Sequence, residues 1–192
     1  MAAFDVKKAY KDLYAPKTEP MQLVVPPMPF IAIDGCGNPN DQGGVYASAL
    51  TLLYALCYTI KMSKLAKSGV LLDGYYDDVV PPLEGFWQMA DGRPGVDYGN
   101  KEGFVWTSLI RQPDFVTAGV FDWACDEVQK KKGLDPAPAR LITIDEGLCV
   151  QCMHIGPFDD EPATVEKMNR YMAETGLVPD FSSGPCGALP RG

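Results

Sequence analysis

Histidine, positive charge and long apolar runs are all scarce in this chain of 192 residues. The only histidine is His154, so the sequence offers no set of imidazole ligands, and we expect no metal. Lys and Arg total 17 against 25 Asp and Glu, and the net charge of -8 argues against a nucleic-acid partner because phosphates would be repelled. Apolar stretches such as 47–57 are too short to cross a bilayer, so we expect no membrane partner. The charged first residues lack the apolar segment of a secretion signal, which predicts a cytoplasmic protein.

Motifs of the common enzyme classes are also missing. The chain has no G-x-S-x-G elbow, no Walker loop and no G-x-G-x-x-G fingerprint, and we expect no cofactor. Gly35-Cys-Gly37 is a lone G-x-G followed by Asn-Pro-Asn, which is typical of a turn. The six cysteines are expected to be reduced. Cys149 and Cys152 form a C-x-x-C pair, but 148–155 is predicted to be a strand, so the two thiols should point to opposite faces.

The pattern of apolar, polar and turn-forming residues predicts an α+β protein with mainly antiparallel strands. Helices are expected at 41–67, 117–132 and about 160–176, and strands at 30–34, 79–87, 104–110, 141–144 and 148–155. The last two strands are expected to form a hairpin, and the element order suggests two β-α-β-β modules that pair into one sheet. Residues 1–28, rich in proline, are expected to form an arm, residues 29–181 the domain, and residues 182–192 an irregular tail.

Four separated segments carry a resemblance to a known family. They read GCGNPN at 35–40, VVPPLEGFW at 79–87, IRQPDF at 110–115 and EGLCVQCMHIGPFDDEP at 146–162. Together they resemble the GyrI-like small-molecule-binding family, and more closely its stand-alone bacterial members, which include proteins like the cyclopropanoid cyclopropyl hydrolases. The resemblance implies two pseudo-twofold-related strand-helix-strand-strand modules, with helices on one face of the sheet and a ligand cleft on the other. It also implies a strand after the last helix, for which residues 182–192 are unsuited.

Glu84 is the main candidate for a catalytic or ligand-binding residue. It is a carboxylate within the apolar segment Leu83–Trp87, where it would either face solvent or line the concave face of the sheet. Tyr76 is a candidate catalytic hydroxyl. The candidate ligand-binding residues on or beside the strands are Glu84, Phe86, Trp87, Phe104, Trp106 and His154. Aromatic residues at alternating strand positions also suit a core, and a lone histidine also suits a structural hydrogen bond, so both alternatives stay open.

Three functions follow from these features. The first is a cytosolic protein that binds planar lipophilic or cationic compounds in an aromatic, acidic cleft, for xenobiotic protection or sensing. The second, implied by the resemblance, is a hydrolase that opens the cyclopropane ring of duocarmycin-like DNA-alkylating compounds. The third is a gyrase-binding inhibitor, which rests on the family name alone. A homodimer is left open.

Overall fold

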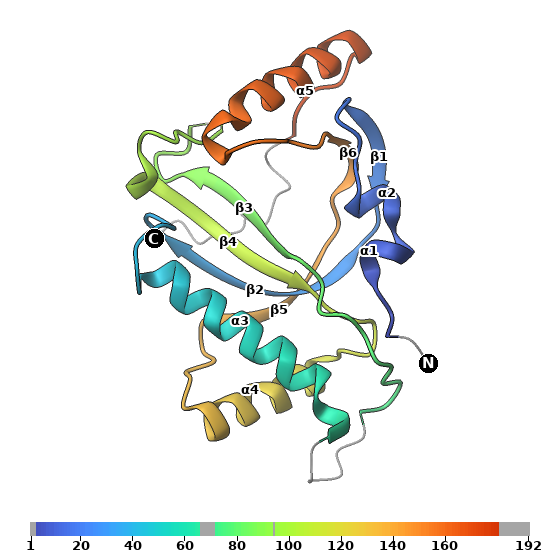
Figure 1. Ribbon diagram of the computed structural model, residues 1–192, viewed down its shortest axis with the longest axis vertical. Coiled ribbons are helices and arrows are strands. Elements are labelled where there is room, and N and C mark those ends of the chain that lie inside the picture. Colours follow the sequence, from blue (N-terminus) through green and yellow to red (C-terminus); the bar gives the residue numbers. More distant parts are fainter. Residues whose placement is uncertain (1–2, 66–71, 94, 181–192) are drawn as a thin grey trace. The chain divides into compact units, whose positions relative to one another are not determined.

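The computed structural model describes residues 3–65, 72–93 and 95–180, and it has the α+β class that the sequence predicts (Figure 1). The helices are α1 (Val6–Ala9), α2 (Lys11–Tyr14), α3 (Val45–Lys61), α4 (Ala118–Lys132) and α5 (Glu161–Thr175), with short 3-10 helices η1 (Ser63–Leu65), η2 (Lys101–Gly103) and η3 (Phe158–Asp160). The strands are β1 (Met21–Val25), β2 (Met28–Cys36), β3 (Leu83–Met89), β4 (Phe104–Arg111), β5 (Ala139–Ile144) and β6 (Gly147–Gln151). All pairings between these strands are antiparallel.

The chain divides into two compact units. The first unit holds the residues up to Asp5 and Met28–Ile144, and the second holds Val6–Pro27 and the residues from Asp145 onward. The first unit contains a four-stranded sheet in the order β3-β4-β2-β5, and the second contains a two-stranded sheet of β1 and β6. The strands therefore form two sheets and not the single sheet that the element order suggested.

The hydrophobic core of the first unit lies between the four-stranded sheet and two helices. Helix α3 packs against β2 and β4, and α4 packs against α3 (Figure 1). The largest apolar side chains that are fully buried in this core are Ile31, Leu53, Leu56, Ile60, Trp106, Ile110 and Val128. Because side chains alternate along a strand, every second residue of β2 and β4 reaches this core and the residues between them point the other way.

The helix ends follow local capping chemistry. The side chain of Thr117 accepts a hydrogen bond from the Val120 amide at the start of α4, and Gly133 ends that helix in the left-handed conformation with φ of 65°. Gly176 ends α5 in the same way. Helix α3 is shorter than the helix expected at 41–67, because it begins after Gly44 and its last residue is Lys61.

Strand β2 is longer than the sequence predicted. Gly35 and Cys36 belong to the strand, and the turn begins only at Gly37, whose φ is 96°. A Cβ atom at Gly35 would lie 2.3 Å from two ring carbons of Trp106, which faces it from β4. Glycine is therefore present at position 35 because an indole ring occupies the space of a side chain.

The predicted hairpin of the last two strands is wrong. Strand β5 pairs with β2, and β6 pairs with β1, which lies in the segment expected to be an irregular arm. The connection Asp145-Glu146 is short enough for a hairpin. The same length of chain can also join two strands that belong to different sheets, as β5 and β6 do here. In the described part of the chain no strand follows α5, and the expected tail at 182–192 lies outside the described residues.

Candidate functional site

Glu84 and Phe86 lie on the face of the four-stranded sheet that points away from α3, here called the distal face. Their neighbour Trp87 packs on Tyr46 of α3, with the ring centroids 5.5 Å apart, so the alternate residues Glu84 and Phe86 must point away from that helix. Both side chains are partly exposed. Alternation and register give the other residues of this face as Met28, Phe30, Ala32, Asp34 and Cys36 on β2, Gln88 on β3, Val105, Thr107, Leu109 and Arg111 on β4, and Arg140, Ile142 and Ile144 on β5.

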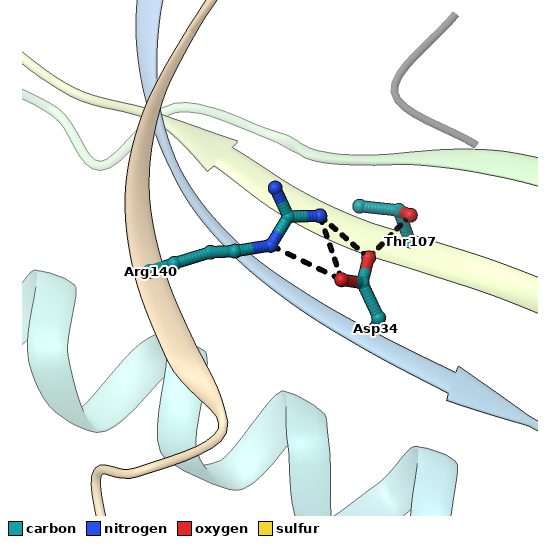
Figure 2. Close-up of polar contacts among 3 residues, drawn as sticks. All are labelled: Asp34, Thr107 and Arg140. Atoms are coloured by element: carbon teal, nitrogen blue, oxygen red, sulfur yellow. Dashed lines mark hydrogen bonds and ion pairs between the residues drawn. The ribbon is translucent and has the colours of Figure 1, made fainter. Parts of the chain in front are cut away.

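A polar network joins three strands on the distal face (Figure 2). The Asp34 carboxylate on β2 accepts three hydrogen bonds from Arg140 on β5, one from Nε at 3.1 Å and two from Nη2 at 2.7 Å. It accepts a fourth from the Thr107 hydroxyl on β4, at 2.6 Å. Several donors thus hold one carboxylate, which fixes both its orientation and that of the guanidinium plane.

Exposure to solvent changes along the distal face. Phe30, Ala32, Thr107 and Leu109 are buried, whereas Asp34, Phe86, Gln88, Val105 and Arg140 are partly exposed and Cys36 is exposed. The side-chain exposures of Asp34 and Arg140 are 28% and 37%. Solvent therefore reaches the end of the face that carries Cys36, and it also reaches Glu84 on the edge strand β3.

This arrangement can recognise a flat molecule by two kinds of contact. The ring of Phe86 offers an apolar surface, and the Glu84 carboxylate two residues away offers a partner for a positive or partly positive group. A carboxylate can also orient a water molecule or accept its proton. The Asp34–Arg140 pair adds hydrogen-bond donors on the opposite side of the same face.

Known proteins share the fold and much of the sequence. The model of the GyrI-like family, described as a GyrI-like small molecule binding domain, matches residues 18–186. The chain belongs to the GyrI-like family. A crystal structure of a hydrolase from Listeria innocua is 44% identical with a TM-score of 0.86, and the alignment covers 95% of this chain and 86% of that one.

Two further solved structures from Listeria innocua resemble this GyrI-like chain. One is described as a hydrolase, with 44% identity, a TM-score of 0.79, and coverage of 90% of this chain and 85% of that chain. The other is described as an uncharacterized conserved protein, with 44% identity, a TM-score of 0.81, and coverage of 90% and 82%. No curated protein matches the chain.

Three of the predicted aromatic residues lie in the core of the GyrI-like domain and not beside Glu84. Trp87, Phe104 and Trp106 face α3, where Trp106 is 0% exposed and meets Tyr46 edge-on with the ring centroids 5.0 Å apart. Trp87 and Phe104 meet at 5.8 Å across β3 and β4. The alternation that places Glu84 and Phe86 on the distal face puts these rings on the other one.

Tyr76 belongs to a separate group of rings. Its ring lies edge-on to Phe4 at 5.6 Å and to Phe115 at 5.3 Å, in the connection between α3 and β3. The structure therefore gives Tyr76 aromatic packing partners and does not group it with Phe86 on β3.

His154 lies in the second unit and is hydrogen bonded through both ring nitrogens. Nδ1 lies 2.8 Å from the Thr164 hydroxyl on α5, and Nε2 lies 2.9 Å from the Pro157 carbonyl oxygen. These bonds fasten the turn after β6 to the following helix. Cys149 and Cys152, which flank the end of β6, are both free thiols.

A small cavity lies beside α3, apart from the distal-face network. Its volume is about 10 Å³, which is room for one water molecule, and its polar lining includes Lys61, Asp78 and Gln112. Burial raises the pKa of the Asp78 carboxyl, although Lys61 partly opposes this, and burial raises the pKa of the Cys57 thiol to about 12. The cavity is too small for an organic ligand.

No group of three or more His, Cys, Asp or Glu within residues 3–65, 72–93 and 95–180 is arranged to hold a metal ion. In the same residues no helix combines the length and apolar character needed to span a bilayer.

Sequence reasoning missed the network of Asp34, Thr107 and Arg140. One signal was available. Asp34 is a carboxylate at the end of the apolar segment Phe30–Ile33, just as Glu84 is a carboxylate within an apolar segment. Arg140 carried no comparable signal, since its pairing with Asp34 joins residues 106 positions apart.

Proposed function

We propose that this GyrI-like domain binds planar lipophilic compounds with a cationic or electron-poor group on the distal face, through Glu84 and Phe86. The observation that carries the proposal is that both side chains lie on the same face, partly exposed and directed away from the hydrophobic core. The net charge of -8 favours cationic partners over anionic ones. A cytoplasmic role in protection against such compounds, or in sensing them, fits this ligand class.

Hydrolysis of the bound compound is the second candidate. It is supported by the structures from Listeria innocua that are described as hydrolases and are 44% identical to this chain. The substrate we propose is a cyclopropane conjugated to a carbonyl group. The water oxygen bonds to a ring carbon, the strained carbon–carbon bond breaks, and its electron pair moves to the carbonyl oxygen, which takes a proton. The net change is the addition of one water molecule.

Glu84 would orient that water and accept its proton. Ring strain supplies the driving force, so positioning of water and substrate is most of what the protein must provide. Tyr76 does not enter this proposal because its ring packs against Phe4 and Phe115. We also assign no direct role to His154, whose two ring nitrogens are both occupied.

The test compares Glu84→Gln with a control that removes the same charge elsewhere. Asp122 is exposed on α4, so Asp122→Asn is the matched control. Tetramethylrosamine, a planar lipophilic cation, is titrated against each protein. Glu84→Gln should weaken binding by about 1–3 kcal/mol, the usual loss for a charged hydrogen bond, and Asp122→Asn should leave it unchanged.

The hydrolytic candidate needs a separate measurement. A cyclopropane-bearing alkylator is incubated with each protein, and mass spectrometry follows the appearance of the water adduct. If Glu84 assists water, its replacement should slow adduct formation by roughly 10²–10⁴-fold. If the protein binds the compound but no water adduct forms, it is a binding protein and not a hydrolase. If the Glu84 and Asp122 variants give the same affinities and the same rates of adduct formation, the proposed site is contradicted.

A further inference from the structure

Helix α3 presents an uncharged surface to solvent. It has no charged residue from Val45 to Ile60, although several of its side chains are exposed. Helix α4, which is of similar length, carries three acidic residues and three lysines. A helix at the surface of a protein normally has charged residues on its outer side, and a helix that lacks them all round is typically covered by other structure. The outer side of α3 therefore has the composition of an interface.

The exposed residues of α3 recur every three or four positions, so they form one stripe along the helix, here called the α3 stripe. Its residues, from the N-terminal end, are Gly44, Ala47, Ser48, Thr51, Tyr54, Tyr58 and Met62. Tyr58 is 49% exposed and Met62 is 44% exposed. The rings of Tyr54 and Tyr58 lie with their centroids 6.4 Å apart, so the apolar surface is continuous at the C-terminal end of the stripe.

The hydroxyl groups of the α3 stripe can be covered without losing a hydrogen bond. Ser48 donates to the carbonyl oxygen of Gly44 at 3.1 Å, and Thr51 donates to that of Ala47 at 2.9 Å. Burial of a hydroxyl is costly when its donor is left without an acceptor. Because both donors are satisfied within the helix, a protein surface can pack on the stripe without that cost.

The size of the side chains changes from one end of the α3 stripe to the other. The large ones, those of Tyr54, Tyr58 and Met62, all lie in the C-terminal half, and the N-terminal half has only small ones. Two copies packed in parallel would set large side chains against large ones. In an antiparallel pair with Tyr54 opposite Thr51 of the second copy, Tyr58 lies opposite Ala47. The stripe is therefore complementary to itself when the second copy runs in the opposite direction.

Opposite charges at the two ends of α3 fit the same alignment. Asp41 is exposed shortly before the helix, and Lys64 is exposed shortly after it. The alignment that sets Tyr54 opposite Thr51 also sets Lys64 opposite Asp41 of the second copy, and twofold symmetry repeats this pair at the other end. Lys64 already donates to Asp77 at 2.8 Å, but an ammonium group has three donors and can serve a second carboxylate.

We propose that two copies of this chain associate through their α3 stripes, packed antiparallel about a twofold axis. Each copy carries a net charge of -8, so two copies approach most readily through a surface without acidic residues. A membrane surface fits the stripe less well, because no basic residue lies along it. Helix α3 has 17 residues and is about 25 Å long. One helix pair gives a small interface, so we expect a dimer with a dissociation constant in the micromolar range.

Sedimentation velocity over about 1 to 300 µM protein tests the association, with a reducing agent present because Cys36 is an exposed thiol. The unaltered protein should change from monomer to dimer over this range. Thr51→Glu places two like charges beside the twofold axis and should weaken dimerisation by about tenfold or more. Gln129→Glu adds the same charge at an exposed position of α4 and should leave it unchanged. If circular dichroism shows that Thr51→Glu does not fold, Tyr58→Glu carries the test.

Charge exchange tests the antiparallel alignment. Asp41→Lys brings two ammonium groups together and should weaken the dimer by about two- to fivefold, the scale of an ion pair on the surface. Lys64→Glu brings two carboxylates together and should have a similar effect. The double variant restores opposite charges and should dimerise more tightly than Lys64→Glu, since both lack the bond from Lys64 to Asp77.

Three results would overturn the proposal. The first is a monomer at every concentration of the unaltered protein. The second is a dimer that Thr51→Glu and Gln129→Glu affect equally, because the interface would then lie away from α3. The third is a double variant that dimerises no more tightly than Lys64→Glu, because Asp41 and Lys64 would then not meet across the twofold axis.

Discussion

Replacement of Gly35 by alanine should destabilise the domain strongly. The added Cβ atom would lie 2.3 Å from two ring carbons of Trp106 and 2.9 Å from a third. Carbon atoms in contact normally lie about 3.5–4.0 Å apart, so the ring or the strand must move by more than 1 Å, roughly. Trp106 is fully buried and packs against Tyr46, which leaves the ring no free space.

Overpacking of this kind typically lowers the free energy of unfolding by about 1–3 kcal/mol. Because the clash involves the rigid ring of a fully buried residue, we expect a value at the upper end, about 3 kcal/mol. Urea unfolding followed by circular dichroism measures it, and the slope of the transition should not change.

A double variant separates the clash from a general effect of alanine in a strand. Trp106→Phe removes the ring carbons that the new Cβ would meet and destabilises the protein by itself through a cavity. If the clash is the cause, Gly35→Ala should cost much less in the Trp106→Phe background than alone. The reasoning would be refuted if the effects of the two substitutions on the unfolding free energy were additive. It would also be refuted if Gly35→Ala alone lowered that free energy by less than about 0.5 kcal/mol.

Three further predictions concern the first unit. Burial raises the pKa of Asp78 in the folded protein. The protonated carboxyl therefore contributes its full stability at a pH below the pKa of Asp78 in the unfolded chain, and this contribution is lost as the pH rises through the pKa of Asp78 in the folded protein. Asp78→Asn should therefore gain stability relative to the unaltered protein between about pH 4 and 7, and a constant difference across urea titrations in that range would contradict this. The Cys57 thiol, with its pKa raised to about 12 by burial, should resist iodoacetamide at pH 8 while exposed Cys36 reacts, as peptide mass mapping will show. Thr117→Ala removes the cap of α4 and should lower the unfolding free energy by about 1 kcal/mol in the same urea assay. Thr117→Ser keeps a hydroxyl at the cap and should retain most of the stability.

The elements that the sequence predicted well are those governed by neighbouring residues. Helix α4 begins at the Thr117 cap and ends at Gly133, as expected, because capping depends on a few consecutive positions. Strand β4 was predicted nearly to its ends, since apolar residues with a high preference for strands lie at both ends of the segment Phe104–Ile110. The partners of β5 and β6 could not be predicted in this way, because the choice of partner depends on residues more than 100 positions away.

The same distinction between local and distant determinants applies to the candidate site. Alternation along β3 indicates from the sequence alone that Glu84 and Trp87 cannot share a face. It does not say which face the helices cover, and the contact of Trp87 with Tyr46 decides that. The pairing of Asp34 with Arg140 requires the register between β2 and β5, which no local pattern encodes.

The pairing of β1 with β6 has a consequence for the order of folding. Val25 pairs with Gly147, so about 120 residues must be closed into a loop, at an entropic cost of about 4 kcal/mol beyond a constant term. A two-stranded ribbon is barely stable by itself and could not offset that cost. Strands β2 and β5, however, pair Met28 with Ile144, and only two residues separate each of these from the ribbon. Once the first unit has folded, the loop is already closed, and during synthesis β1 must wait unpaired until the whole of that unit has been made.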